Sequence, residues 1–185
     1  PGSLWVEQAL TVSITNVNEA PTALALAPAV LAEGQPIGTL AGTFSVTDQD
    51  FPPHSFELVS GGAGCAATGN SAFTLAGNQL RSAAVFDFET QSSYAICARA
   101  TDSGSPALSQ TLAFTLLVPD TNETPTALNL SSDSLEENEP ADTLVGTFST
   151  SDPDPTQTHT YTLADGIAGC DGTVPGGGAG GLGHD

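Results

Sequence analysis

Pairs of acidic residues two positions apart recur along the chain. They are Asp48 and Asp50, Asp87 and Glu89, and Asp152 and Asp154. On an extended backbone this spacing places both carboxylates on one side of the chain. Ca²⁺ takes about six to eight oxygen ligands and needs several acidic side chains brought together. The pairs therefore predict divalent-cation binding by carboxylates.

Two histidines follow two of these pairs at equivalent positions. His54 comes after the pair at 48 and 50, and His159 after the pair at 152 and 154. A zinc site would require more nitrogen or sulfur ligands nearby than the sequence supplies. The expected ion is therefore Ca²⁺, held by oxygen atoms.

The acidic pairs recur because the chain repeats itself. NEAPTAL at 18–24 returns as NETPTAL at 122–128, an offset of 104, and LAEGQPIGTLAGTFSVTDQD at 31–50 returns at the same offset as LEENEPADTLVGTFSTSDPD. This period fits a small β-sandwich and is too long for a helical solenoid. We expect the last strand and linker of one unit at 1–20, a complete unit at 21–124, the truncated start of a third at 125–170, and a Gly-rich tail at 171–185. The chain would then be a piece of a longer polypeptide.

Short alternating or β-rich runs fill the complete unit. They lie near 23–27, 40–47, 54–60, 72–76, 79–85, 93–101 and 110–118. Turn residues separate these runs, and no window carries a helical apolar period. The pattern predicts an all-β fold of Ig-like Greek-key β-sandwich repeats in tandem, nearly without helix. In the run at 110–118, one face should carry Leu112, Phe114, Leu116 and Val118, and residues 4–17 should form the equivalent strand of the preceding unit.

Composition limits the partners. The net charge of −19, with two Lys plus Arg, argues against nucleic acid or an anionic membrane surface. No apolar run is long enough for a membrane span, and no signal peptide is recognisable. The 39 % of hydrophobic residues can fill a small core.

The three cysteines follow the repeat. Cys65 in GAGC aligns with Cys170 in IAGC, so each unit should own a pair, with Cys97 as the partner of Cys65. Such a pair indicates an oxidising compartment, while buried free thiols are the alternative.

Several motifs together resemble one family. FDFET, ATDSG, the linker DTNETP, the DQD pair and the ENEP before TLVGTF look like the calcium motifs of cadherin repeats, in their bacterial cadherin-like form. The resemblance covers about 150 residues and five motifs in family order. It implies calcium ions held where successive domains join, by the base of one domain, the linker and the top of the next.

Carried over by motif, the resemblance implies two ligand sets. The junction near 120 would use Glu33, Asp87, Glu89, Asp120, Asn122, Glu123, Asp152 and Asp154. The junction near 18 would use Asn16, Asn18, Glu19, Asp48, Asp50 and Asp102. Asn16 stands where the family has Asp, so that junction should bind weakly or not at all. Glu19 and Glu123 stand where many animal cadherins have Asp, which favours the bacterial form.

The function expected is therefore mechanical. No GxSxG, HExxH, P-loop or Cys–His motif appears, and acids that repeat from unit to unit suit a serial structural role better than an active site. We expect an extracellular, secreted or cell-surface adhesion or extender module, stiffened by calcium, whose partners are adjacent repeats and other surface proteins, glycans or identical chains. The alternatives are a filament subunit that assembles by strand addition and an accessory domain of a secreted polysaccharide-active enzyme. An acidic surface without an ion is the alternative to the metal sites.

Overall fold

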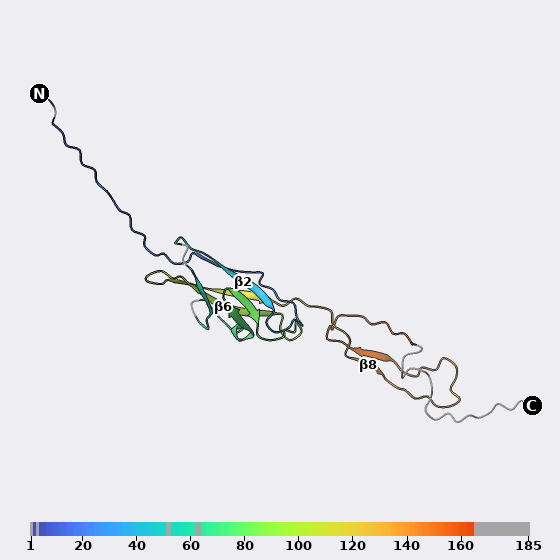
Figure 1. The fold of residues 1–185 in the computed structure, drawn as a ribbon. Coiled ribbons are helices and arrows are strands. Elements are labelled where there is room, and N and C mark those ends of the chain that lie inside the picture. Colours follow the sequence, from blue (N-terminus) through green and yellow to red (C-terminus); the bar gives the residue numbers. More distant parts are fainter. Residues whose placement is uncertain (1, 3, 51–52, 62–63, 165–185) are drawn as a thin grey trace, which may run out of the picture. The chain divides into compact units, whose positions relative to one another are not determined.

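The computed structural model describes residues 2, 4–50, 53–61 and 64–164 (Figure 1). The chain divides into two compact units, Pro1–Thr121 and Asn122–Asp185. The expected tail at 171–185 and Cys170 lie outside the described residues. The other unit boundaries expected from the repeat stay predictions.

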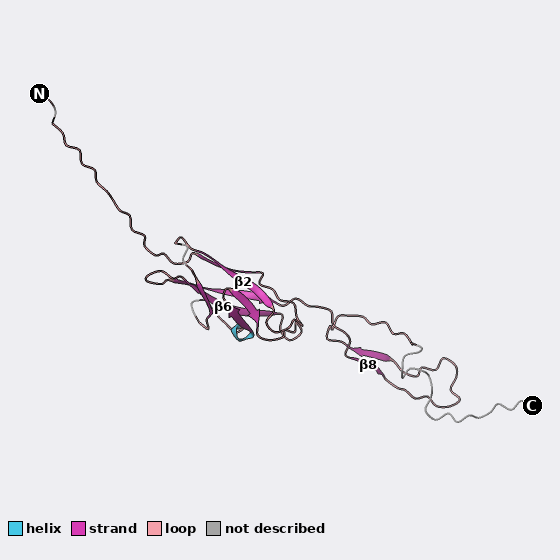
Figure 2. Ribbon diagram, in the orientation of Figure 1, coloured by secondary structure: helices cyan, strands magenta, loops and turns pink. Residues whose placement is uncertain are grey.

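The first unit is a β-sandwich. Its strands are β1 (Ala23–Ala27), β2 (Leu40–Thr47), β3 (Ser55–Leu58), β4 (Phe73–Ala76), β5 (Gln79–Ser82), β6 (Ser93–Thr101) and β7 (Ser109–Leu117). One sheet has the order β1-β2-β5-β4 and the other β3-β6-β7, and neighbouring strands are antiparallel. Helix in the described part of the chain is limited to the 3-10 turn Asn70–Ala72, cyan in Figure 2. The predicted all-β sandwich is confirmed.

Three of the strands have the predicted bounds, and the others differ at their ends. β1, β2 and β6 match the predicted runs, whereas the run at 54–60 forms a strand only at 55–58 and the run at 79–85 only at 79–82. β5 ends at Ser82 because its partner β4 begins there, at the pair Phe73–Ser82. A hydrogen-bonded ladder cannot continue without a partner strand. Where the partner ends cannot be read from the sequence of one strand alone.

The core lies between the two sheets. Leu24, Phe44 and Leu80 enter it from one sheet, and Ile96 and Leu116 from the other, each no more than 4 % exposed. The Phe44 ring lies 5.8 Å from the Phe56 ring and 5.6 Å from the Phe114 ring, and such offset and edge contacts add to the apolar burial.

The apolar face predicted on β7 is only partly inside. Leu116 and Val118 are buried and Phe114 is half-buried, but Leu112 is 42 % exposed. β7 is an edge strand, paired with β6 along one side. Its start is therefore open to solvent, and the predicted face is buried only toward its end.

A glycine permits close contact at the first edge of the larger sheet. The pairing of β2 with β5 shifts register between Leu40 and Gly42. A Cβ at Gly42 would lie 2.4 Å from the Pro28 carbonyl oxygen and 2.7 Å from a methyl carbon of Leu26. Since real Cβ atoms do not approach that closely, the packing of Leu26 and Pro28 against β2 requires glycine at position 42.

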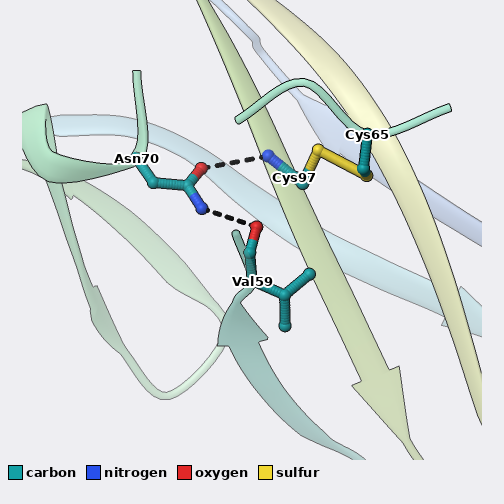
Figure 3. The surroundings of a disulfide bond; sticks show 4 residues. All are labelled: Val59, Cys65, Asn70 and Cys97. Carbon is teal, nitrogen blue, oxygen red and sulfur yellow. Dashed lines mark hydrogen bonds between the residues drawn. A yellow bond between two sulfur atoms is a disulfide. The ribbon is translucent and has the colours of Figure 1, made fainter. Parts of the chain in front are cut away.

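A disulfide fastens the loop that covers β6. It joins Cys65 to Cys97, as the repeat predicts, with the two Cα atoms 5.7 Å apart. Figure 3 shows Asn70 beside it, where the Asn70 amide donates to the Val59 carbonyl at 2.8 Å and accepts from the Cys97 N–H at 3.0 Å. Loop and amide together bury Cys97 completely.

The second unit and the N-terminal segment hold less secondary structure. β8 (Ala127–Leu130) and β9 (Phe148–Ser151) form an antiparallel pair in the second unit. No strand precedes Ala23 among the described residues, so the strand expected at 4–17 is not formed. Its alternating Leu10, Val12 and Ile14 are more than 80 % exposed. A strand needs hydrogen bonds to a neighbour, and none pairs with this segment in the described structure.

Candidate metal centre

The sandwich carries acidic groups at both ends of its strands. Asp102 follows β6 directly, whereas Asp87 and Glu89 precede it. We call Asp48, Asp50 and Asp102 the N-terminal acidic group, because segment 16–19 bonds to it. We call Glu33, Asp87 and Glu89 the C-terminal acidic group. Because the two groups flank the same strand, they lie at opposite ends of the unit.

Glu33 organises the C-terminal acidic group. It is 4 % exposed. Its Oε2 accepts the Phe88 N–H at 2.7 Å and its Oε1 accepts the Thr121 N–H at 2.5 Å. One buried carboxylate thus connects the loop before β6 with the end of the unit. Charge-assisted bonds of this kind are stronger than neutral ones.

Asp87 and Glu89 complete this group from an exposed turn. The hydroxyl of Thr90 bonds to Asp87 at 2.9 Å and the Thr90 N–H at 3.1 Å, and these bonds hold the pKa of Asp87 below its usual value. Glu33, Asp87 and Glu89 each offer a carboxylate oxygen, and these oxygens lie within 4.8 Å of one another. Glu89 and Asp120 also have carboxylate oxygens within that distance.

The N-terminal acidic group is satisfied by donors from segment 16–19. The Asn16 amide donates to Asp50 Oδ1 at 2.7 Å, and the Glu19 N–H donates to Asp50 Oδ2 at 2.8 Å. The Asn18 amide donates to Asp102 Oδ2 at 3.0 Å. Five of the six residues expected near 18 therefore take part in these bonds.

These bonds set the acidities of the group. The Glu19 N–H, and then the Asn16 amide, lower the pKa of Asp50. A hydrogen bond with the Asp50 carboxylate raises the pKa of Glu19, and burial and the nearby charge of Asp50 act in the same direction. Burial alone would raise the pKa of Asp102, but bonds from the Leu108 N–H, the Asn18 amide and the Gly104 N–H outweigh it and lower that pKa.

The acidic pairs do not lie on extended backbone. Asp48 Oδ1 accepts the N–H of Asp50 at 2.9 Å, and Asp152 Oδ1 accepts the N–H of Asp154 at 3.0 Å. A carboxylate that bonds to the N–H two residues on forms an Asx-turn, which bends the chain. The structure thus corrects the extended geometry expected from the spacing, although both carboxylates of each pair stay at the same loop.

The histidines have a role that sequence reasoning missed. His54 Nε2 lies 2.9 Å from Asp48 Oδ2, and His159 Nε2 lies 2.7 Å from Asp152 Oδ2. An ionised carboxylate can only accept, so each imidazole donates. The bond with His159 is the first cause that lowers the pKa of Asp152. The signal in the sequence was the recurrence of His at the same place after each pair.

The second unit repeats the bonds of Asp48 and Asp50 at the equivalent residues Asp152 and Asp154. The Glu123 N–H donates to Asp154 Oδ2 at 2.9 Å, as the Glu19 N–H does to Asp50. Gln157 adds a bond to Asp154 Oδ2 at 2.8 Å and one to Asn122 Oδ1 at 2.5 Å. Gln157 was not expected in the site, and no motif distinguished it.

The residues present fit a hard divalent cation. The C-terminal acidic group offers carboxylate oxygens alone, the donor type that Ca²⁺ prefers. Three carboxylates within 4.8 Å repel one another unless a positive charge lies among them.

Comparison with known proteins supports the same family as the motifs. No family model matches the sequence. The chain is 30 % identical to protocadherin gamma-A11 from Pan troglodytes over 175 residues, which is 89 % of this chain and 18 % of the relative. It is 29 % identical to protocadherin gamma-A9 from Homo sapiens over 170 residues, 87 % of this chain and 18 % of the relative. The chain is cadherin-like.

Solved structures agree with this description. The structure of human protocadherin-24 EC1-2 has a TM-score of 0.53 at 19 % identity, over 71 % of this chain and 60 % of that one. Protocadherin gammaB7 EC3-6, a cis-dimer structure, has a TM-score of 0.51 at 25 % identity, over 73 % of this chain and 32 % of that one. The expected cadherin-like fold and the extracellular location of such domains are confirmed.

The chain spans about 18 % of the length of the curated relatives it matches. Those relatives come from primates, so the bacterial form favoured by Glu19 and Glu123 stays a prediction. In the described part of the chain, no helix has the length and hydropathy needed to cross a membrane.

Proposed function

We propose that this chain is a calcium-stiffened extracellular adhesion or extender module. The observation that carries the proposal is the C-terminal acidic group, in which three carboxylates converge beside the last residue of the unit. The likeness of the chain to protocadherins, which are adhesion proteins, supports the adhesive role. The recurrence of acids from unit to unit supports a structural role over catalysis.

Each part of the proposed junction has its own task. Glu33 fixes Thr121 through the N–H bond and thereby sets where the linker leaves the unit. Asp87 and Glu89 present carboxylates from the exposed turn, and Asp120 adds one at the start of the linker. The expected partners across the Thr121–Asn122 bond are Asn122, Glu123, Asp152 and Asp154.

The physical effect is a change in stiffness. When bound, Ca²⁺ supplies the positive charge that offsets the repulsion among these carboxylates. Without it, the acids favour separation, so the turn and the linker can move apart. In a tandem array, calcium binding would convert a flexible linker into a rigid one. This suits a module that extends a surface protein or holds cells together.

Calorimetric titration of the whole chain with CaCl₂ tests the proposal. The native chain should bind in the micromolar to millimolar range expected of extracellular calcium modules. Asp87→Asn combined with Glu89→Gln should weaken binding at least about tenfold, which is about 1.4 kcal/mol.

A matched control removes the same charge elsewhere. Glu7 lies in the N-terminal segment and Asp133 in the second unit, and both are exposed. Glu7→Gln combined with Asp133→Asn should leave the binding constant unchanged. Equal loss in both double variants would show that net charge, not a built site, attracts the ion.

A further inference from the structure

The two linkers differ at their first residue, and this difference determines whether that residue can donate hydrogen bonds to nearby carboxylates. The linker NVNEAP begins with Asn16, whereas DTNETP begins with Asp120. An asparagine amide can donate hydrogen bonds to a carboxylate, and an aspartate cannot. Asn16 therefore brings hydrogen-bond donors to the acids at its junction, whereas Asp120 brings one more negative charge.

Segment 16–19 uses this donor capacity against the N-terminal acidic group. Asn16 donates to one oxygen of Asp50 at 2.7 Å while the Glu19 N–H donates to the other at 2.8 Å. The amide of Asn18 uses both of its hydrogens, one to Asp102 at 3.0 Å and one to the Pro106 carbonyl at 2.9 Å. An amide oxygen facing these carboxylates would be repelled, which fixes the orientation of both asparagines.

Every carboxylate oxygen of the N-terminal acidic group accepts a bond from the protein. The Gly104 N–H and Leu108 N–H donate to Asp102 Oδ1 at 3.0 and 2.9 Å. The Asp50 N–H donates to Asp48 Oδ1 and His54 Nε2 donates to Asp48 Oδ2, at 2.9 Å each. Among the described residues, no set of three acidic, His or Cys ligand atoms within 4.8 Å includes Asp48, Asp50 or Asp102.

The glycine beneath Asn18 is part of this arrangement. A Cβ on Gly104 would lie 1.9 Å from Asn18 Oδ1 and 2.4 Å from Asn18 Nδ2. The loop can therefore seat the amide only because residue 104 has no side chain.

We infer that segment 16–19 is an amide latch, in which Asn16 and Asn18 hold the linker on the sandwich without calcium. Resting on the function proposed above, the inference makes the two junctions unlike: the one near 120 stiffens with calcium, and the one near 18 stays fixed. A parent array would then flex at chosen joints when calcium falls. Joints whose linker begins with Asp would flex without calcium, and joints whose linker begins with Asn would not.

Hydrogen exchange of the whole chain, in CaCl₂ and in EGTA, tests the latch. The amide of Glu19 should exchange at rates within about twofold in the two buffers, and the amide of Glu123 at least about tenfold faster in EGTA. Faster exchange at Glu19 in EGTA, to the same degree as at Glu123, would overturn the latch while leaving the calcium function intact. If neither amide changed its exchange rate with calcium and calorimetry showed no binding, the proposed function would be wrong, but the latch would still stand.

Two variants separate the latch from general stability. Asn16→Asp removes a donor and adds a charge, so exchange at Glu19 should become at least about tenfold faster in EGTA than in CaCl₂. Gly104→Ala should speed exchange at Glu19 in both buffers while all carboxylates remain. Gly61→Ala is the control, since a Cβ there meets nothing within 4 Å. Unchanged exchange at Glu19 in both Asn16→Asp and Gly104→Ala would overturn the inference.

Discussion

Short polar side chains at strand ends determine the local backbone of this domain. Asp48, Asp102 and Asp152 each accept the N–H two residues on, and these Asx-turns end strands β2, β6 and β9. Asparagine has a parallel task, since Asn70 joins the covering loop to β6 (Figure 3). Residues of this kind compete with the ladder for backbone bonds and so favour turns over strands.

Asn70→Ala should destabilise the first unit by about 2 kcal/mol, because the buried Cys97 N–H and the Val59 carbonyl would lose their partner. Urea denaturation followed by circular dichroism measures the change in the free energy of unfolding. Ser71→Ala, at the exposed neighbouring position, should change it by less than about 0.5 kcal/mol. Equal effects would show that the turn itself, not the amide bridge, carries the stability.

At the scale of elements, the alternating or β-rich runs between turn residues were enough to place the strands. β1, β2 and β6 have the predicted bounds. The shorter β3 and β5 could not be bounded, since a strand ends where its partner does. Likewise, the motifs grouped the acids at 48, 50 and 102 with Asn16, Asn18 and Glu19, but as ligands of one ion and not as hydrogen-bond donors and acceptors. His54 and Gly104 act through contacts that only the folded loops create.

Gly42→Ala should destabilise the first unit by about 1–3 kcal/mol, since its methyl group would press on the Pro28 carbonyl and on Leu26 and force β1 away from β2. Thermal unfolding by calorimetry measures the effect. Gly61→Ala serves again as the control. A Gly42→Ala variant as stable as the native chain would mean that β1 shifts freely, against the packing described.

Reduction of the Cys65–Cys97 disulfide should cost roughly 3 to 4 kcal/mol in the chain-entropy model, for a sequence separation of 32. The measurement is urea denaturation with and without a reductant, in a Cys170→Ser background that prevents exchange of partners. Adding Cys65→Ser should produce the same loss and abolish the response to reductant. A response that persists in that variant would contradict the pairing.

At the scale of the whole molecule, the two acidic groups differ in whether they need an added positive charge. The chain has a net charge of −19 and two Lys plus Arg, so it has few cationic side chains to offset its acids. At the N-terminal acidic group, neutral amides and a histidine serve instead. At the C-terminal acidic group, carboxylates converge and a cation is the expected complement. The two ends of one domain thus meet the same electrostatic problem in different ways.

The most direct test of the calcium joint is the distribution of distances between spin labels on the two units. Labels at Thr74→Cys in β4 and Ser149→Cys in β9, both exposed, can be measured in a Cys170→Ser background by pulsed electron resonance. We expect a broad distance distribution in EGTA that narrows in CaCl₂, and no narrowing when Asp87→Asn and Glu89→Gln are added. A distribution of the same width in both buffers, in a chain shown by calorimetry to bind calcium, would contradict this expectation.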